Sequence, residues 1–468
     1  MDIAELSYYY ITILSKAKGY NLQSIANKAF VAKADKRNFI MDLHKDPLEF
    51  NEKYQPYISR DIVFKNNSLV TRKSLLISPA HYFYYTNLVF EIVLEDYNKT
   101  ILQYNKEKIT AFYSGILFKS LGHISSPREI LFDNSYNQFQ EKLIEFEGRQ
   151  AIELDLSSFF ESIHINDLLD KLYTKYKREK VKSLETFFEE IGLTKLPQFH
   201  YSIASSILSQ EYLSEFDNEI QMLLKSEDLE MVRFVDDMYF FNNGSTKPER
   251  KFHEFLDTIN NMLWLDGLNL NTNKVALYID RKKLFDRELS EVSYGGFEFK
   301  VVKDIEEKAS SLIEQDFFKF IIEANKLYMK KGYDIKGFSE LFDKTFSVKS
   351  GEARKVLNNF VYSNKWTKLS NKEMKYIILH YHFVFFLPDI FLILYLKIYD
   401  YIEMKHGRDE DTIRKFLGRI DDNNINSLRY LYSSLNYLIQ RNFKREKFLE
   451  RLTTFNKELG GFINNYIK

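Results

Sequence analysis

The sequence predicts an α+β fold that is followed by an all-α, helical-repeat-like C-terminal domain. Residues 150–300 alternate short apolar strands with helices, and tight turns join the strands, as in a small, mostly antiparallel sheet. Residues 305–468 have helical periodicity alone, in stretches of similar length separated by short breaks. We therefore expect one domain at 1–304 and a helical domain at 305–468.

The composition is that of a globular chain with more than one core. The chain has 468 residues, of which 45% are hydrophobic, enough for two or three packed units. Basic and acidic residues both number 66, and this zero balance argues against non-specific coating of nucleic acid. The absence of cysteine excludes disulfides and thiolate chemistry, so a reducing cytoplasm is the expected location. The acidic start of the chain does not resemble a signal peptide.

The first 120 residues are predicted to be mainly helical, with one exception. Apolar residues recur at spacings of three and four in "HYFYYTNLVFEIVLEDYNKTI", which is typical of a helix. Residues 56–79 differ, because β-rich pieces flank an Asn-Asn-Ser turn. That pattern predicts a hairpin that projects basic side chains.

The central region is predicted to run strand, helix, helix, hairpin, helix and two further strands. Short apolar runs indicate the strands, and amphipathic stretches indicate the helices. The predicted positions are a strand at 151–156, a helix near 165–180, a helix after Pro197, a hairpin around Asp236 and Asp237, a helix at 249–264, and strands near 275–279 and 294–301.

The C-terminal region raises one alternative, a membrane span at 376–396. Its length would suit a span, but Pro388, Asp389 and two histidines interrupt it. A charged residue near the middle of a bilayer costs about 3 kcal/mol. We therefore expect two buried helices that meet at a proline turn, and no membrane partner. The helices are predicted to break near Gly332, Gly351, Ser370, Gly407 and Asn423.

Two acidic positions stand at the ends of apolar runs. Asp155 follows the apolar strand in "AIELDLSSFF", and Asp236 and Asp237 occupy the middle of "MVRFVDDMYFF". Each has an ordinary alternative, since a strand-ending aspartate is often a helix N-cap and an Asp-Asp pair is often a solvated turn. On neighbouring strands the two positions could instead hold a pair of Mg²⁺ ions, which prefer carboxylate and carbonyl oxygens.

These residues resemble the motifs of reverse transcriptases. "LDLSSFF" resembles the first catalytic motif, and "FVDD" resembles the second, usually Tyr-x-Asp-Asp. Between them "LPQFHYSIASSILSQEYL" resembles the Leu-Pro-Gln segment under the incoming nucleotide. "LNLNTNKVALY" and "YGGFEF" then resemble the Leu-Asn-x-x-Lys element and the glycine turn near the primer. Five elements in this order imply a reverse-transcriptase-like fingers and palm.

The resemblance implies a role for each matching residue. Asp155 and Asp236 would ligate two Mg²⁺ ions, with Mn²⁺ as an alternative, and Asp237 would complete the cluster. The Leu156 carbonyl would be a further ligand. Phe160 would be the steric gate that selects deoxynucleoside triphosphates, with core packing as its alternative. Three further sets would contact the nucleotide: Gln198; Lys274, near the departing phosphates; and Arg72 with Lys73, whose alternative is a solvated turn.

Two departures narrow the resemblance. Phe199 stands where many templated polymerases have a glycine after Leu-Pro-Gln, which puts template placement in doubt. The long helical C-terminal region replaces a compact thumb. Together these features resemble the bacterial abortive-infection (Abi) reverse transcriptases of the AbiK and AbiA kind and their prophage-encoded relatives. That resemblance implies antiphage defence, untemplated DNA synthesis, a single-stranded DNA product covalently attached to the protein, and homo-oligomers.

Protein priming requires a hydroxyl that can reach the acidic site. The run Tyr8-Tyr9-Tyr10 is the most conspicuous candidate, with Tyr8 as the first choice because it is nearest a free end, and its alternative is aromatic core packing. His200 is expected to be structural, although it lies close enough to the site to contact substrate. Two other functions stay open at this point: a templated RNA-directed DNA polymerase of another bacterial defence system, and a non-catalytic palm scaffold that binds a phage or host protein.

Overall fold

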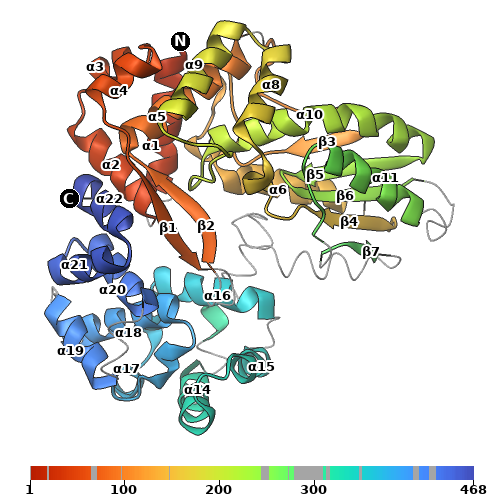
Figure 1. Ribbon diagram of the computed structural model, residues 1–468. Coiled ribbons are helices and arrows are strands. Elements are labelled where there is room, and N and C mark those ends of the chain that lie inside the picture. The colour runs from red at the N-terminus through yellow and green to blue at the C-terminus, as the bar shows by residue number, and fades with distance from the viewer. Residues whose placement is uncertain are drawn as a thin grey trace.

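The computed structural model describes most of the chain and is mixed α and β (Figure 1). The predicted strand at 294–301, the "YGGFEF" motif and the domain boundary at 304 lie outside the described residues. The described residues are 2–17, 21–64, 71–95, 97–146, 148–243, 252–271, 274–278, 309–312, 317–346, 350–403, 410–420 and 428–467.

Five helices form the N-terminal part, as the periodicity predicts. Side chains of Asn21, Asp35 and Asp46 accept hydrogen bonds from the first turns of the second, third and fourth helices, which satisfies backbone N–H groups that have no partner within the helix. The fifth helix is buried on nearly all sides. The helices are α1 (Ile3–Ala17), α2 (Leu22–Lys33), α3 (Lys36–Asp42), α4 (Pro47–Lys53) and α5 (Pro79–Leu94).

The hairpin predicted at 56–79 is confirmed. Strand β1 (Ile58–Phe64) pairs antiparallel with β2 (Thr71–Ile77), with Ile58 opposite Ile77. The hairpin extends from the N-terminal helices toward the C-terminal helices in Figure 1. It therefore contacts both halves of the chain.

The central sheet has five strands in the order β3-β5-β6-β4-β7. The pair β3–β5 is parallel and the other pairs are antiparallel, so the prediction of a small, mostly antiparallel sheet is confirmed. The strands are β3 (Ile109–Phe112), β4 (Ala151–Asp155), β5 (Leu229–Phe234), β6 (Asp237–Asn242) and β7 (Ala276–Tyr278). The helices of this region are α6 (Phe132–Ile144), α7 (Phe159–Ser162), α8 (Ile165–Lys175), α9 (Arg178–Glu190), α10 (Ile203–Ser226) and α11 (Phe252–Leu265).

Within the described part of 309–467, all regular structure is helical. Gly332 follows the first long helix at φ +66°, and Ser370 caps a later one, as predicted. One helix ends at Phe346 and the next begins at Ser350, so the break predicted near Gly351 is confirmed, while Gly407 and Asn423 lie outside the described residues. The helices are α14 (Phe317–Lys331), α15 (Ile335–Phe346), α16 (Ser350–Tyr362), α17 (Asn371–Leu379), α18 (Pro388–Glu403), α19 (Glu410–Ile420), α20 (Leu428–Gln440), α21 (Glu446–Phe455) and α22 (Lys457–Tyr466).

The segment 376–396 contains the predicted proline turn. Helix α17 ends at Leu379, a short 3₁₀ turn follows, and α18 begins at Pro388, where the missing N–H of proline costs no hydrogen bond. Among the helices of the described ranges, none is both long and apolar enough to cross a bilayer.

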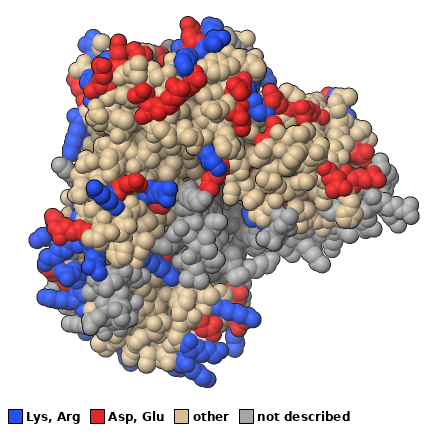
Figure 2. Space-filling model, in the orientation of Figure 1, with Lys and Arg blue, Asp and Glu red and all other residues tan. Residues whose placement is uncertain are grey.

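The C-terminal helices pack onto the N-terminal part through β1 and α2. The apolar cluster of the C-terminal helices includes Leu22 and Ala26 from α2, Ile62 from β1 and Leu76 from β2. Helix α22 packs against β1, and the Tyr57 hydroxyl donates a 2.8 Å hydrogen bond to the Glu458 carbonyl. Acidic and basic side chains are both present on the visible face, with acidic ones more frequent at the upper right and basic ones at the bottom (Figure 2).

Candidate active site at an acidic sheet edge

The sheet brings the predicted carboxylates together. Asp155, the last residue of β4, lies opposite Asp237, the first residue of β6. Asp237 is also paired with Phe234 at the end of β5, so Val235 and Asp236 form the two-residue turn of the β5–β6 hairpin. Apolar strands on both sides of the turn are buried, which fixes the register and leaves the acids at the sheet edge.

The hairpin turn holds a strained residue. Val235 has φ +55°, although a β-branched residue is rarely stable in that region. Such a conformation costs roughly 1–3 kcal/mol and persists only when its surroundings impose it. The Val235 N–H donates to the Phe112 carbonyl at 3.0 Å, and its carbonyl accepts from Arg233 at 3.3 Å. Strain of this kind is typical of functional sites.

Beneath the turn lies a buried ion pair that the sequence analysis missed. Arg233 of β5 is fully buried and forms a bidentate pair with Asp217 of α10, at 3.1 Å from Nε and 2.6 Å from Nη2. The Gln210 side chain is a further acceptor. An arginine inside the apolar run "MVRFV" is a signal that could have indicated a buried charge, although not the acid that pairs with it. The pair therefore fixes the β5–β6 hairpin to α10.

Asp155 accepts hydrogen bonds from two side chains of the segment that precedes β7. Lys274 Nζ lies 2.8 Å from Asp155 Oδ1, and Asn271 Nδ2 donates to Oδ2 at 2.8 Å. The Asn271 backbone N–H also donates to the Asp155 carbonyl at 2.8 Å. Asn271 is a further residue that the sequence analysis left without a role, although it belongs to the Leu-Asn-x-x-Lys element. Lys274 was expected near the departing phosphates, and here it neutralises a carboxylate.

The electrostatics of the site indicate an excess of negative charge. Burial, together with the neighbouring Asp236 and Asp155 carboxylates and a hydrogen bond to Asp155, raises the pKa of Asp237 well above its usual range. Burial opposes the charge of Lys274, but the hydrogen bond to Asp155 and the three carboxylates raise its pKa overall. One lysine thus offsets the charge of the cluster only in part.

These residues fit hard divalent cations by the chemistry of their donors. All the side-chain donors are carboxylate oxygens, and a cation would relieve the repulsion that raises the pKa of Asp237. In the part of the chain that the structure describes, no three acidic or histidine side chains are already arranged around a common metal position. Since Lys274 and Asn271 each donate to one oxygen of Asp155, a cation would compete with Lys274 for that carboxylate.

The Leu156 carbonyl is oriented toward the same edge. Leu156 is bridged antiparallel to Leu270, and the flanking hydrogen bonds run from Ser157 N to Asn269 O and from Asn271 N to Asp155 O. In such a pair the polar groups of the central residue point away from its partner strand. The Leu156 carbonyl therefore points toward the β6 side, where Asp236 and Asp237 lie.

The two phenylalanines after Asp155 have different surroundings. Phe159 is buried at 3% exposure, as predicted for a core residue. Phe160 is half-buried and contacts the Phe159 ring with a centroid distance of 5.5 Å. Phe160 thus packs on Phe159 and is still partly exposed, five residues after Asp155 in the chain.

The Leu-Pro-Gln segment lies against the β1–β2 hairpin. The Gln198 carbonyl accepts from Leu75 N and Ser74 Oγ, both at 3.1 Å, and Phe199 is buried in a parallel bridge with Leu75. The left-handed backbone position belongs to Tyr201, at φ +53°. Arg72 and Lys73 are on β2, opposite Val63 and Ile62, and their side chains lie outside the described residues.

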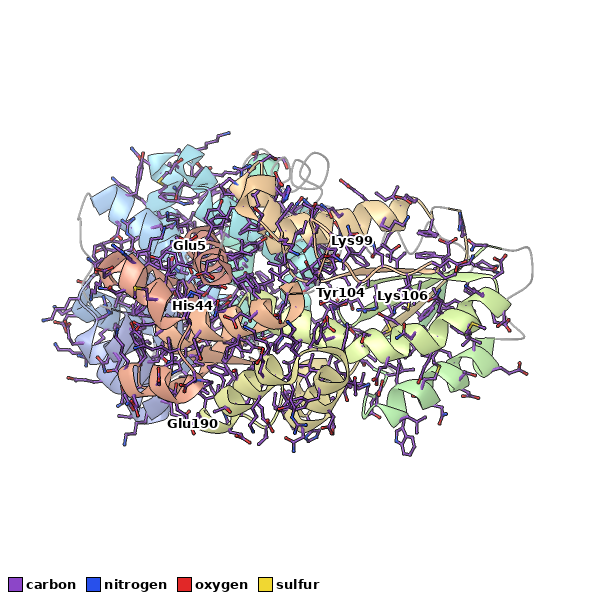
Figure 3. The ribbon with its side chains drawn as sticks, turned by 90° about the horizontal axis from the view of Figure 1, so that it is seen from above. Glu5, His44, Lys99, Tyr104, Lys106 and Glu190 are labelled. Atoms are coloured by element: carbon purple, nitrogen blue, oxygen red, sulfur yellow. The ribbon has the colours of Figure 1, made fainter. Side chains whose placement is uncertain are left out.

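The candidate priming tyrosines lie on α1, among the N-terminal helices. Tyr8 is buried against Phe39 and Phe83. The Tyr10 hydroxyl is buried between the Ile116 carbonyl and the Phe118 N–H, and burial raises the pKa of both hydroxyls. Tyr9 is half-buried. Helix α1, marked by Glu5 in Figure 3, lies outside the sheet, so a priming role would need the chosen hydroxyl to leave these contacts.

Compared with known proteins, the chain matches no protein-family model and no curated sequence. The assignment of a function therefore depends on the residues and the geometry of the acidic sheet edge.

Proposed function

We propose that this chain is a DNA nucleotidyltransferase with a reverse-transcriptase-like palm that acts in antiphage defence. The observation that carries the proposal is the pairing of Asp155 with Asp237 across adjacent strands, with Asp236 in a strained turn between β5 and β6. Carboxylates are rarely gathered at a partly buried edge without a function, because their mutual repulsion is costly.

The site would hold two Mg²⁺ ions, or Mn²⁺, through Asp155, Asp236, Asp237 and the Leu156 carbonyl. When bound, the ions would lower the pKa of the attacking hydroxyl and offset charge on the leaving pyrophosphate. In nucleotidyl transfer the hydroxyl oxygen bonds to the α-phosphorus of a deoxynucleoside triphosphate, and the bond from that phosphorus to the pyrophosphate oxygen breaks.

The protein side chains would orient the substrate. Lys274, once away from Asp155, would lie near the triphosphate as a positive charge. Gln198 would contact the nucleotide from the segment held against β2. Arg72 and Lys73 would contact the phosphates from the same strand.

Untemplated, protein-primed synthesis is the form of the activity that we favour. Phe199 is buried and bridged to Leu75, so the backbone there is closed to the approach that a glycine would allow. Of the three candidate tyrosines, Tyr9 requires the least rearrangement to expose its hydroxyl, because it is the least buried. The proposal includes a covalently attached single-stranded DNA product, a homo-oligomer and a cytoplasmic location.

The decisive experiment is incubation of the purified protein with Mg²⁺ and labelled deoxynucleoside triphosphates, without nucleic acid. The label should stay with the protein on a denaturing gel, and nuclease should collapse the resulting shift in mass. Strict dependence on an added RNA template would instead support a templated polymerase. A protein that incorporates no nucleotide under either condition, yet captures a phage or host protein, would support the scaffold alternative.

Replacing Phe160 is expected to weaken discrimination between deoxyribonucleotides and ribonucleotides. The variant Phe160→Ala removes the half-buried ring near Asp155, which would otherwise clash with a 2′-hydroxyl. We expect ribonucleotide incorporation to rise by about tenfold or more relative to deoxynucleotide incorporation, since one steric contact is worth roughly 1–3 kcal/mol. Phe159→Leu is the control, because Phe159 is core. Equal discrimination by wild type and Phe160→Ala would place the gate elsewhere.

A further inference from the structure

A buried carboxylate on β1 joins two segments that are distant in the sequence. Asp61 is 7% exposed, and its Oδ2 lies 2.7 Å from His200 Nε2. Its Oδ1 accepts a 2.8 Å hydrogen bond from the Tyr432 hydroxyl of α20 and a 2.7 Å bond from the Ile62 N–H. Since a carboxylate only accepts, His200 donates from Nε2. Asp61 therefore links the Leu-Pro-Gln segment to the C-terminal helices.

The link is charged as well as buried. Burial alone would raise the pKa of Asp61, but the hydrogen bonds from His200, Tyr432 and the Ile62 N–H, with the nearby His200 charge, hold it below the usual range. Hydrogen bonds to a charged group in a buried setting are stronger than neutral ones. Removing one of these donors therefore weakens the network that holds the Asp61 carboxylate in place.

The segment 198–201 receives further support at its backbone. Ser74 Oγ and Leu75 N hold the Gln198 carbonyl, and the Tyr82 hydroxyl donates to the His200 carbonyl at 2.8 Å. These contacts come from β2 and α5, in the N-terminal part. The Asp61 contact differs, because its second donor, Tyr432, belongs to the C-terminal helices.

We infer that Asp61, His200 and Tyr432 form a positioning link by which the C-terminal helices fix the segment 198–201 for nucleotide binding. The part of the inference that concerns nucleotide binding rests on the proposed function. His200 acts through the position of Gln198, two residues earlier, and Tyr432 acts through Asp61. The C-terminal helices then have a part in substrate affinity, although none of their described residues belongs to the acidic site.

The test compares two variants on the same helix. Tyr432→Phe removes only the hydroxyl that reaches Asp61. Tyr437→Phe, on the same helix α20, removes a hydroxyl that donates to Asp400 of α18, inside the C-terminal helices. Both variants lose one hydrogen bond to a carboxylate, so a general loss of stability affects both. Only Tyr432→Phe should disturb the segment 198–201.

Two measurements are made on the full chain. Hydrogen–deuterium exchange of peptides covering 196–204 should be about threefold or more faster in Tyr432→Phe than in wild type and Tyr437→Phe. The KM for deoxynucleoside triphosphate should rise about threefold to tenfold in Tyr432→Phe, with kcat within about twofold. His200→Gln, which keeps a donor toward Asp61, should lie closer to wild type than His200→Leu in both measurements.

The outcomes test the Asp61 link and the proposed function separately. Exchange in Tyr432→Phe that equals that of Tyr437→Phe overturns the link, whatever the enzyme does. Faster exchange with an unchanged KM overturns the positioning role. If the wild-type protein incorporates no nucleotide, the proposed function fails, and the exchange measurement still decides whether the link exists.

Discussion

The variants Asp155→Asn and Asp236→Asn are each expected to lower nucleotide incorporation by about a hundredfold or more, while the fold survives. The substitution keeps the size of the side chain but removes the charge that would hold a divalent cation, and at Asp155 it also replaces one of the two oxygens that accept from Lys274 and Asn271. Incorporation of labelled deoxynucleotide is the measurement, made with Mg²⁺ and with Mn²⁺.

The control is Asp228→Asn. Asp228 precedes β5, away from the β5–β6 turn, is exposed, and makes only a loose 3.9 Å ion pair with Lys108. It has φ +50°, which asparagine tolerates well, so its variant should retain wild-type activity and stability. Normal incorporation by both Asp155→Asn and Asp236→Asn would refute the proposed catalytic role of the acidic edge.

The variant Asp237→Asn is expected to lose activity but to gain stability relative to wild type as the pH rises. Its pKa is raised in the folded state, first by burial and then by Asp236 and Asp155. As the pH rises above about 4, the unfolded chain releases this proton before the folded chain does, so the free energy of unfolding falls. Asp237→Asn does not titrate there. The free energy of unfolding of Asp237→Asn and of wild type is measured in urea with a chelator present. The difference between them should therefore grow in favour of the variant from pH 4 to pH 8, whereas the activity of the variant is lost.

The second large effect is expected at the ion pair beneath the turn. Arg233→Met should lower the free energy of unfolding by about 3–5 kcal/mol, because it leaves the Asp217 carboxylate buried without its partner. Urea unfolding measures the loss. The same substitution removes the hydrogen bond to the Val235 carbonyl, so nucleotide incorporation should also fall, by about tenfold or more.

A double variant separates the two roles of Arg233. Arg233→Met combined with Asp217→Leu removes both charges and should be more stable than Arg233→Met alone. It should not regain activity, because the Val235 turn still lacks its arginine donor. Recovery of activity together with stability would show that Arg233 acts only through the stability of the fold.

The sequence by itself determined most of the secondary structure and the identity of the acids. Apolar periodicity distinguishes helix from strand locally, so the 56–79 hairpin, the strand ending at Asp155 and the hairpin at Asp236 could be predicted without tertiary contacts. The helix break near Gly351 could be predicted in the same way, although the glycine itself lies in the first turn of the following helix.

Only the tertiary structure decided which side chains meet. The pairing of Asp155 with Asp237 depends on strand order and register, and the contacts of Asp155 with Lys274 and Asn271 depend on where a later segment returns to the sheet. Local patterns carry no information on such long-range contacts, since these depend on how whole elements pack. For the same reason the buried Arg233–Asp217 pair and the Asp61 link to Tyr432 could not be predicted: each joins residues whose own neighbours in the sequence give no sign of the partner.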